Sequence, residues 1–425
     1  MMGKKTPLVL LLLALLPCLS LGAVDFGIVL DQRVGYGGYS GLENNHVDYS
    51  GSIISRFSVL LGTIGSFYIS AGAGADFPSE AWQPKSKLMV VPELLRTEVS
   101  LNFGNGNLLF GRMYYSDPLG FIADGLFDGI QFSYESAMGT LSVGAWYTGL
   151  LYKKRANIAM TIEEVQFHRG DADYTQFADT YFAPRRLVSA VGWAHPSLGE
   201  RIRLKLALLG QFDLPDDRMN QFVLFGNEAG RLHSQYLALK LTIPAGVFVF
   251  DLGGCFEFLQ FSGSGEGTTG IAMAGDLGIS LVPTMGSQLS LLGRYSSGRA
   301  DDNDSRLYAF GPLTAVQQGN IFREKLSGLS MISLDFFARL HQMIAVNLNA
   351  ACFMRSDLGT YSGYLATGEK TYFLGTEVSG RLFWSLLSDV QFTIGGGAFL
   401  PLLGNVARDA NMLWRVEFNF ILSVL

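Results

Sequence analysis

The chain has 425 residues, a formal net charge of −6 and no basic tract, which excludes the electrostatic footprint of a nucleic-acid-binding protein. Hydrophobic residues make up 48% of the chain and charged residues only 16%, whereas soluble domains carry roughly 25% charged residues. Beyond residue 22, no apolar stretch reaches the roughly 18 residues that a membrane-spanning helix needs. A membrane-like composition without membrane helices favours a closed β-barrel, because every backbone polar group in lipid must be paired within the protein.

The N-terminus has the anatomy of a secretory signal peptide. A basic start, an apolar run over residues 8–16 and small residues up to Gly22 follow one another in the expected order. Lipidation at Cys18 is the alternative, which the preceding proline disfavours. We therefore expect residues 1–22 to be a cleaved signal peptide and residues 23–425 to form a single domain.

Beyond the signal peptide, the dominant pattern is the alternation of apolar and polar residues that is typical of a strand with two different faces. In the last segment, for example, Trp414, Val416 and Phe418 alternate with Arg415 and Glu417. About 18 such segments follow in series, close to the 9–11 residues that a tilted membrane strand needs. Their expected spans are 24–33, 50–62, 66–75, 91–103, 107–115, 127–136, 140–152, 186–194, 201–212, 233–243, 246–261, 271–283, 288–297, 327–340, 343–355, 371–384, 389–399 and 412–425.

The connections between these segments alternate in length. Even-numbered segments are followed by tight turns such as Gly104-Asn105-Gly106, a strong type I′ hairpin signal. Odd-numbered segments are followed by long loops, among them residues 153–185 and 297–326. Short periplasmic turns and long external loops are the layout of outer-membrane barrels. The sequence therefore predicts an all-β fold, a transmembrane antiparallel β-barrel of about 18 strands.

No pattern indicates catalysis, a metal or a cofactor, so we do not expect an enzyme. The acidic stretches Glu163–Asp173 and Asp301–Asp304 are interpreted as solvated loops rather than cation sites, since they lack a metal-ligand spacing. The glycines of Gly265–Gly270 match a dinucleotide fingerprint in letters only, because they open no helix, and we interpret them as a flexible loop. Cys255 and Cys352 are expected to face opposite sides of the wall and to form no disulfide.

Strand parity predicts a charged lumen. A barrel of this size encloses a space that stays an aqueous channel in porins, although a plug of salt-bridged side chains is the alternative. Arg201, Arg203 and Lys205 lie on one strand and favour anions near the periplasmic mouth, unless acidic partners cancel them. The candidates for the pore lining and constriction are Arg96, Glu98, Arg112, Asp117, Asp124, Arg294, Arg339, Arg381, Arg415 and Glu417. Others expected on the same face are Arg56, Gln131, Glu135, Lys240, Asp251, Glu257, Asp335 and Glu377.

One stretch resembles a known family. Leu109-Phe110-Gly111-Arg112, followed by Phe127-Asp128-Gly129-Ile130, is similar to Gram-negative porins with 16 or 18 strands, in particular the OprD-like and alginate-export-like porins. In those porins, a Gly-Arg strand, an inserted loop and an Asp-Gly-hydrophobic strand recur. The C-terminus departs from the common porin pattern, ending in Leu425 rather than an aromatic residue. The resemblance implies a diffusion channel for small hydrophilic or anionic solutes.

The resemblance also implies that the third external loop, residues 116–126, folds inward and narrows the pore. Its own sequence agrees, because the loop is too apolar to remain in water. We expect Asp117 and Asp124 to face the aperture, opposite Arg96 and Arg112. The alternative is a loop that folds over the rim and packs on a neighbouring subunit.

We therefore expect a passive porin of the outer membrane, whose partners are lipid and small hydrophilic solutes, with homo-oligomerisation left open. Two other functions also stay open. The first is a dedicated transporter of a polymer or a hydrophobic compound, although the first strand begins almost at the cleavage site and leaves no room for an N-terminal plug. The second is a surface adhesin in which the pore is incidental.

Overall fold

The structure is a computed structural model that describes residues 23–39, 45–77, 79–80, 83–84, 89–160, 162–168, 172–199, 201–214, 231–263, 266–283, 286–299, 309–357, 372–401 and 411–424. The predicted signal peptide, Cys18 and the acidic stretch Asp301–Asp304 lie outside these residues, as do Asp171 and Gly265.

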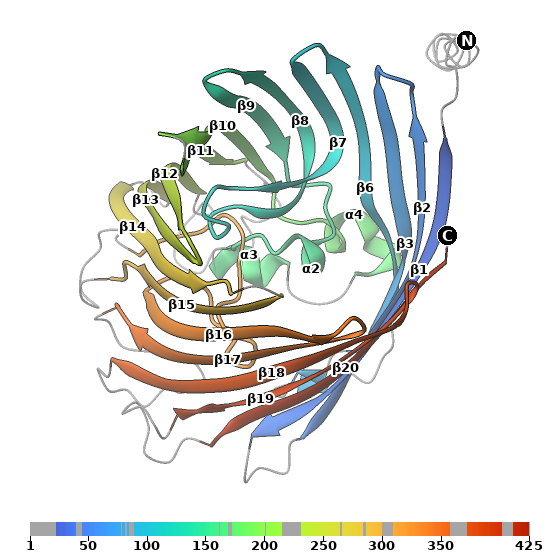
Figure 1. Ribbon diagram of the computed structural model, residues 1–425, viewed down its shortest axis with the longest axis vertical. Coiled ribbons are helices and arrows are strands. Elements are labelled where there is room, and N and C mark those ends of the chain that lie inside the picture. The colour runs from blue at the N-terminus through green and yellow to red at the C-terminus, as the bar shows by residue number, and fades with distance from the viewer. Residues whose placement is uncertain are drawn as a thin grey trace.

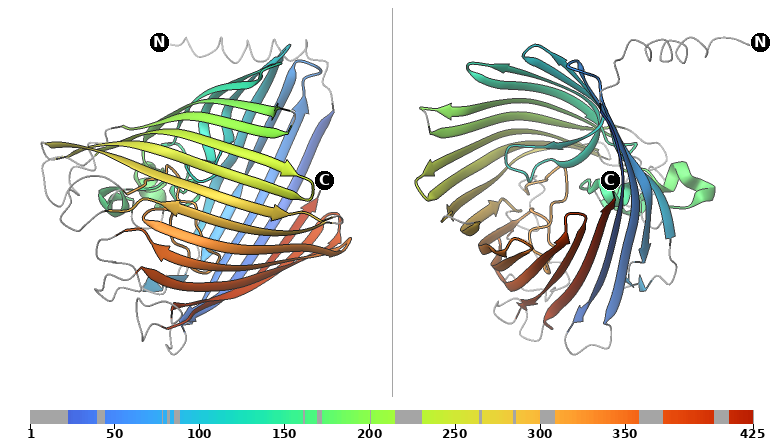
Figure 2. Two further views of the ribbon diagram at one scale, coloured as in Figure 1. Left: turned by 60° about the vertical axis from the view of Figure 1, so that its left-hand side comes forward. Right: turned by 45° about the vertical axis from the view of Figure 1, so that its right-hand side comes forward.

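Eighteen antiparallel strands form one closed barrel (Figures 1 and 2), which confirms the predicted fold class. The barrel closes where β1 pairs with β20, in a register that runs from Ile28 opposite Val424 to Tyr39 opposite Leu413. All the predicted segments correspond to strands. The strands of the barrel are β1 (Val24–Tyr39), β2 (His46–Leu60), β3 (Gly65–Phe77), β6 (Met89–Phe103), β7 (Gly106–Ser116), β8 (Asp124–Ser136), β9 (Gly139–Tyr147), β10 (Arg186–Leu198), β11 (Ile202–Asp213), β12 (Arg231–Ala245), β13 (Phe248–Gly263), β14 (Glu266–Leu281), β15 (Ser287–Ser296), β16 (Leu329–His341), β17 (Ile344–Arg355), β18 (Phe373–Leu387), β19 (Val390–Leu400) and β20 (Leu413–Val424).

The two ends of the barrel differ as predicted, and we call them the turn end and the loop end. At the turn end, tight turns join the strands. The turn between Phe103 and Gly106 is of type II′ rather than the expected type I′, because φ is positive at Gly104 (58°) but not at Asn105. At the loop end, the longest connection spans residues 148–185 and holds the short helices α2 (Lys153–Ala156), α3 (Ile162–Phe167), η2 (Tyr174–Gln176) and α4 (Phe177–Thr180). A minor hairpin, β4 (Ser79–Glu80) with β5 (Gln83–Pro84), lies in another connection. Among the described residues, no helix is both long and apolar enough to span a membrane.

One loop-end connection contradicts the sequence-based expectation. Residues 265–270 were interpreted as a flexible loop, but β13 and β14 stay paired up to Gly263 opposite Glu266. Gly267 and Gly270 therefore lie within β14. Glycine lowers strand propensity, yet the long ladder between two neighbouring strands overrides that local preference.

The outer and inner faces of the wall carry different side chains. On the outer face, Leu348, Val378 and Phe418 are 55%, 54% and 42% exposed. Their neighbours in sequence, such as Glu377 and Glu417, point into the barrel, where Glu377 accepts a hydrogen bond from the backbone N–H of Phe322 and Glu417 pairs with Arg323. The apolar surface is thus turned outward, the reverse of a soluble protein and the arrangement of a barrel in lipid.

The hairpin of β7 and β8 leaves the wall near the loop end. The ladder between β6 and β7 stops at Thr97 opposite Arg112, and beyond that point β7 pairs only with β8. The tip of the hairpin bends into the barrel, where Figure 1 shows it crossing the interior. There, the Leu119 side chain lies so close to Gly253 of β13 that a Cβ atom on Gly253 would be 2.5 Å from it.

Candidate functional site

The interior of the barrel is narrowed by three connections from the loop end: residues 117–123, 148–185 and 309–328. Backbone hydrogen bonds join them. Leu313 N donates to Ile122 O at 2.8 Å, and Ala159 N donates to Leu313 O at 2.9 Å. We call this assembly the loop cluster. It confirms that the third loop folds inward, and it shows that two further connections complete the narrowing.

Asp117 organises the tip of the β7–β8 hairpin. Its carboxylate accepts hydrogen bonds from four backbone N–H groups, those of Leu119, Gly120, Ile122 and Ala123, at 2.7–3.1 Å. The side chain is only 4% exposed. Burial raises the pKa of the Asp117 carboxyl, while the four backbone donors act in the opposite direction. The expectation that Asp117 faces the aperture is therefore wrong, because its oxygens are used within the loop.

Arg112 is the second correction. It lies on the same row of β7 as Phe110 and Tyr114, which are exposed, and opposite the buried row of Met113. Its guanidinium forms a bidentate ion pair with Asp128 at 2.8 and 2.9 Å and also donates to two backbone carbonyls. Arg112 therefore does not line the aperture. Strand parity failed to place Arg112 because the inner row of β7 is apolar like its outer row. The inner row is apolar because it packs on the loop cluster.

Asp124 stays partly accessible at the start of β8, where it is positioned by neighbouring hydroxyl groups. Its carboxylate accepts a hydrogen bond from the Tyr114 hydroxyl, and its backbone N–H donates to Thr314 Oγ1 at 2.8 Å. Its partners are thus a tyrosine of its own hairpin and a threonine of the loop cluster. The expected opposition between Asp124 and Arg112 across an aperture is not observed.

Carboxylates on β13 and β18, across the lumen from β7 and β8, hold the loop cluster in place. Glu377 on β18 accepts backbone N–H groups of Asn320, Ile321 and Phe322 at 2.8–3.0 Å, and it is fully buried. Glu257 on β13 accepts Gly311 N at 2.8 Å. Both residues were expected to face inward, and the structure gives them an anchoring role that strand parity alone does not predict.

Arg294 on β15 also holds the loop cluster against the wall. Its guanidinium lies 3.4 Å from Asp276, donates to Gln318 at 2.8 Å, and stacks over the Phe121 ring with 4.9 Å between the guanidinium carbon and the ring centroid. Arg381 on β18 donates to Asn320 Oδ1 at 2.8 Å. These two candidates hold the loop cluster, although Arg381 also remains exposed to the lumen.

The loop cluster reaches the wall of β1, β2 and β20 as well, through Arg323. A network of charged side chains lies on this wall. Glu417 contacts Arg33, Arg323 at 3.0 Å and Arg415 at 2.6 Å, and Arg415 also reaches Asp48 at 2.6 Å. Three guanidinium groups thus surround two carboxylates. Burial lowers the pKa of Arg323, and the neighbouring Arg415 adds to that effect.

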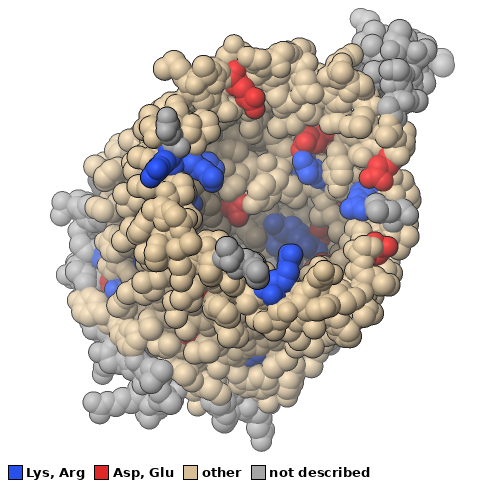
Figure 3. Space-filling view, viewed as in Figure 1, with Lys and Arg blue, Asp and Glu red and all other residues tan. Residues whose placement is uncertain are grey.

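Further cationic side chains line the lumen on either side of this network. Arg96 on β6 pairs with Glu98 at 2.7 Å and remains 43% exposed. Arg155 of the long connection pairs with Glu93 at 3.3 Å and is 48% exposed. Figure 3 shows a hollow in this face of the molecule, with lysine and arginine side chains in and around it.

A basic stripe continues toward the turn end. Arg203, Lys205 and Lys240 lie on the inner rows of β11 and β12, with Lys205 directly opposite Lys240, and Arg201 lies in the turn just before β11. Within the described part of the chain, none of the ion pairs involves these four residues. Arg339 of β16 is likewise exposed near the turn end, beside Gly286.

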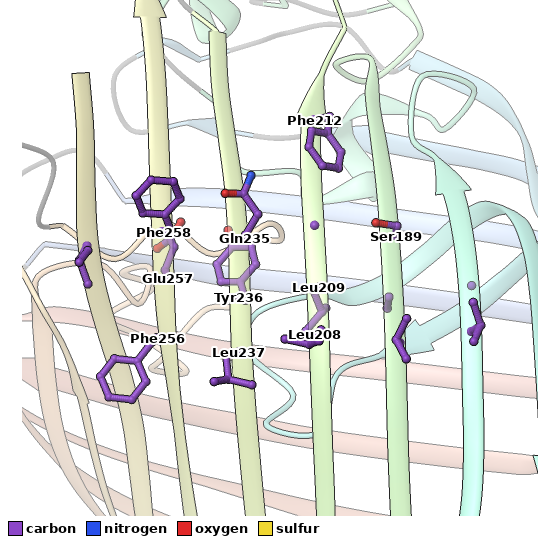
Figure 4. Close-up of a pocket in the computed structure, with 16 residues that line it drawn as sticks. Ser189, Leu208, Leu209, Phe212, Gln235, Tyr236, Leu237, Phe256, Glu257 and Phe258 are labelled. Carbon is purple, nitrogen blue, oxygen red and sulfur yellow. The ribbon is translucent and has the colours of Figure 1, made fainter. Parts of the chain in front are cut away.

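Two apolar depressions lie on the outer face of the wall and do not belong to the lumen. They are lined by residues of β9–β14 and of β11–β17 and have volumes of about 730 and 790 Å³. Figure 4 shows the first depression, lined by outward side chains such as Leu208, Leu237, Phe256 and Phe258. Surfaces of this kind suit acyl chains or a neighbouring subunit, not a polar solute.

Sequence reasoning missed three lumen cations, Arg33, Arg155 and Arg323. Arg155 and Arg323 lie in connections rather than on strands, whereas Arg33 lies at the end of the predicted segment 24–33 and within β1. A signal was present for Arg323. It follows Ile321 and Phe322, an apolar pair inside a loop, which is the same feature that predicted the inward fold of residues 116–126. Within the described residues, no group of His, Cys, Asp and Glu is arranged to hold a metal ion. Cys255 and Cys352 are both free, as predicted.

Comparisons with known proteins support the fold. No protein-family model matches the chain, and no curated protein matches it in sequence. Solved structures do match. OccK2 (OpdF) of Pseudomonas aeruginosa is similar with a TM-score of 0.59 at 11% identity, over 94% of this chain and 97% of that chain. OccAB4 of Acinetobacter baumannii has a TM-score of 0.56 at 9% identity, over 95% and 98%. The resemblance to OprD-like porins is thus confirmed at the level of the fold.

Proposed function

We propose that this chain is an outer-membrane porin through which small hydrophilic solutes diffuse passively, with a preference for anions. The observation that carries the proposal is the contrast between an apolar outer wall and a charged lumen. The loop cluster narrows this lumen, but charged side chains line it on the side of β1, β2 and β20. Water solvates the charges of such a lumen. The same narrowing disfavours passage of a folded or bulky polymer.

The direction of selectivity follows from the exposed charges. Acidic groups such as Glu257 and Glu377 are used by backbone donors of the loop cluster. Exposed guanidinium and ammonium groups extend from Arg33, Arg323 and Arg96 to the basic stripe, and they outnumber the exposed acid Glu135 of the same inner face. Guanidinium groups bind carboxylates in a bidentate fashion. A structurally similar channel, OccK2, has been solved in complex with glucuronate, an acidic sugar, and we propose small carboxylates as the solutes of this chain too.

The proposal includes an orientation. The turn end faces the periplasm and the loop end faces outward, as in other outer-membrane barrels with an even number of strands. Residues 1–22 act as a cleaved export signal, and residues 23–425 form the one domain that reaches the outer membrane. The outer depressions on β9–β17 offer apolar surface for a second copy of the chain, and the proposal therefore includes a homo-oligomer.

Planar-bilayer recording tests this function directly. The wild-type chain is expected to conduct ions and to give a reversal potential on the anion side in a salt gradient. The triple variant Arg201→Gln, Arg203→Gln, Lys205→Gln should shift the reversal potential toward cations without loss of conductance. Liposome swelling should be faster with glucuronate than with an uncharged sugar of the same size. A closed wild-type channel, or a cation-selective one, contradicts the proposal.

A further inference from the structure

The barrel wall contains a seam between β6 and β7. The ladder that joins these strands ends at Thr97 opposite Arg112. β6 nevertheless continues to Met89, paired on one side only with β3, while β7 bends inward with β8. The loop-end half of β6 therefore has a free strand edge facing the place that β7 vacates.

Side chains, not a strand, cap this edge. The carbonyl oxygens of Val90, Pro92 and Leu94 alternate along β6 and so point to the same edge. They accept hydrogen bonds from the Tyr174 hydroxyl, the Tyr181 hydroxyl at 2.9 Å and the Arg112 guanidinium, respectively. Pro92 has no N–H group to offer a partner strand, which is why proline occurs on edge strands.

The connection between β9 and β10 fills the seam, and we call its residues 148–160 and 172–185 the latch. Its rings stack on one another, with centroids 4.8 Å apart for Tyr152 and Tyr181 and 4.4 Å apart for Phe177 and Tyr181. These rings pack against Val91 of β6, which is 2% exposed. The seam is thus closed by an apolar aromatic layer that belongs to a loop.

The seam opens at a depth where the wall meets lipid. Thr97 lies six positions from Phe103 at the turn end of β6. With about 3.4 Å per residue and a tilt of roughly 40°, that places the start of the seam about 16 Å from the turn end. The apolar band of such barrels is about 25 Å tall, so the upper part of the band coincides with the seam. Exposed Val90 and Leu150, each 51% exposed, lie on its two sides.

The lumen side of the seam is cationic. Arg96 lies next to the last paired residue of β6, and Arg155 of the latch contacts Glu93 of the same strand. Both guanidinium groups are close to half exposed, at 43% and 48%. A molecule that passes through the seam would meet both the apolar rings of the latch and these guanidinium groups, because Val91, which the rings cover, and Glu93, which pairs with Arg155, lie on the same row of β6.

We propose that the seam is a lateral portal between the lumen and the lipid, opened by displacement of the latch and suited to an amphiphile with an acyl tail and an anionic head. Single hydrogen bonds contribute only about 1 kcal/mol each, so three of them close the seam less firmly than a continuous ladder closes the rest of the wall. Local opening starts at such weakly held segments. The portal is a second route, independent of end-to-end diffusion of hydrophilic solutes.

A cross-linking experiment tests the portal in the full chain. The double variant Val90→Cys, Tyr174→Cys, made in a Cys255→Ala, Cys352→Ala background, is joined by a flexible bis-maleimide and reconstituted in phospholipid vesicles. The control pair is Ala350→Cys, Val378→Cys, which are direct neighbours in the continuous ladder of β17 and β18. The probe is a fluorescent dodecanoate delivered on albumin, and its transfer into the lipid is measured beside single-channel conductance.

The seam cross-link is expected to slow protein-dependent transfer roughly tenfold, the effect of about 1.4 kcal/mol on a rate, while the control cross-link leaves it unchanged. Tyr174→Phe with Tyr181→Phe keeps the rings but removes two donors, and it should speed transfer. Tyr134→Phe, on the exposed outer row of β8, is the control and should leave the transfer rate unchanged. Equal transfer with and without the seam cross-link overturns the portal. Because conductance is recorded in the same vesicles, that result leaves the proposed porin function intact.

Discussion

The wall of this barrel is held together in two different ways. From β10 to β20 and on to β3, each strand is paired with its neighbours along most of its length, and the backbone ladder itself closes the wall. Between β6 and β9 at the loop end, the ladder is replaced by side-chain hydrogen bonds and stacked rings. The comparison teaches that closure of a barrel does not require full ladders everywhere, provided that the free edge is capped by other groups.

The largest effect is expected at the fork of the seam. Arg112→Met leaves the Asp128 carboxylate without its bidentate partner and frees the Leu94 carbonyl. Removing one member of a buried ion pair costs roughly 3–5 kcal/mol. We expect the free energy of unfolding into urea to fall by that amount. The double variant Arg112→Met, Asp128→Leu should recover part of it, and a double variant no better than the single one contradicts a direct ion pair.

A charged substitution on the lipid face of the continuous wall should lower the free energy of unfolding slightly less than Arg112→Met. Leu348→Arg places a guanidinium on the lipid face of β17, at a cost of about 2–4 kcal/mol near the bilayer midplane. The matched change Asn347→Arg, on the lumen face of the same strand, should be mild. Urea titration in lipid vesicles measures both. If the two variants lose stability equally, the assignment of the two faces is wrong.

A smaller effect is expected where the wall fastens the loop cluster. Glu377→Gln replaces one of the two carboxylate oxygens that accept the N–H groups of Asn320, Ile321 and Phe322. A buried donor without an acceptor costs about 1–3 kcal/mol. The tip of the loop cluster should loosen, which is measured as raised open-channel current noise at constant barrel stability. Unchanged noise would mean that the loop is held by other contacts.

The smallest effect is expected from Asp124→Asn. Its carboxylate lies beside the Tyr114 hydroxyl and not among the cations of β1 and β20. The reversal potential of the channel should therefore stay within experimental error of the wild type. The matched variant Arg323→Gln, inside the cationic network, should move the reversal potential toward cations. A strong response to Asp124→Asn would restore this residue to the constriction.

The continuous wall was predictable from sequence, and the seam was not. Alternation located all eighteen strands because each strand of a lipid-exposed wall needs one apolar row, such as Val416 and Phe418, and one polar row. Alternation does not reveal where two strands stop pairing. The one local signal for the seam was Pro92, a residue without an N–H group in the middle of a strand.

The candidate site was predictable only in part, for a related reason. Strand parity predicts that Arg415 and Glu417 point into the barrel, and on β20 they alternate cleanly with Trp414, Val416 and Phe418. It predicts the same for Arg96, although a β-bulge interrupts β6 beside this residue. It failed at Arg112, where both rows of β7 are apolar. It also failed to predict the role of Asp117, because a carboxylate inside a loop can bind its own backbone as well as face a solute, and composition does not distinguish the two.

The loop cluster joins residues that are far apart in the chain, and this has a consequence for the order of folding. The hydrogen bond between Asp124 and Thr314 closes a separation of 190 residues, and contacts of such range form late because loop closure costs entropy before they add stability. The two partners are carried by separate parts of the wall, β8 and the connection between β15 and β16. The loop cluster therefore needs these parts of the wall to be in place across the bore before its hydrogen bonds can form, so the bore is set no earlier than the wall.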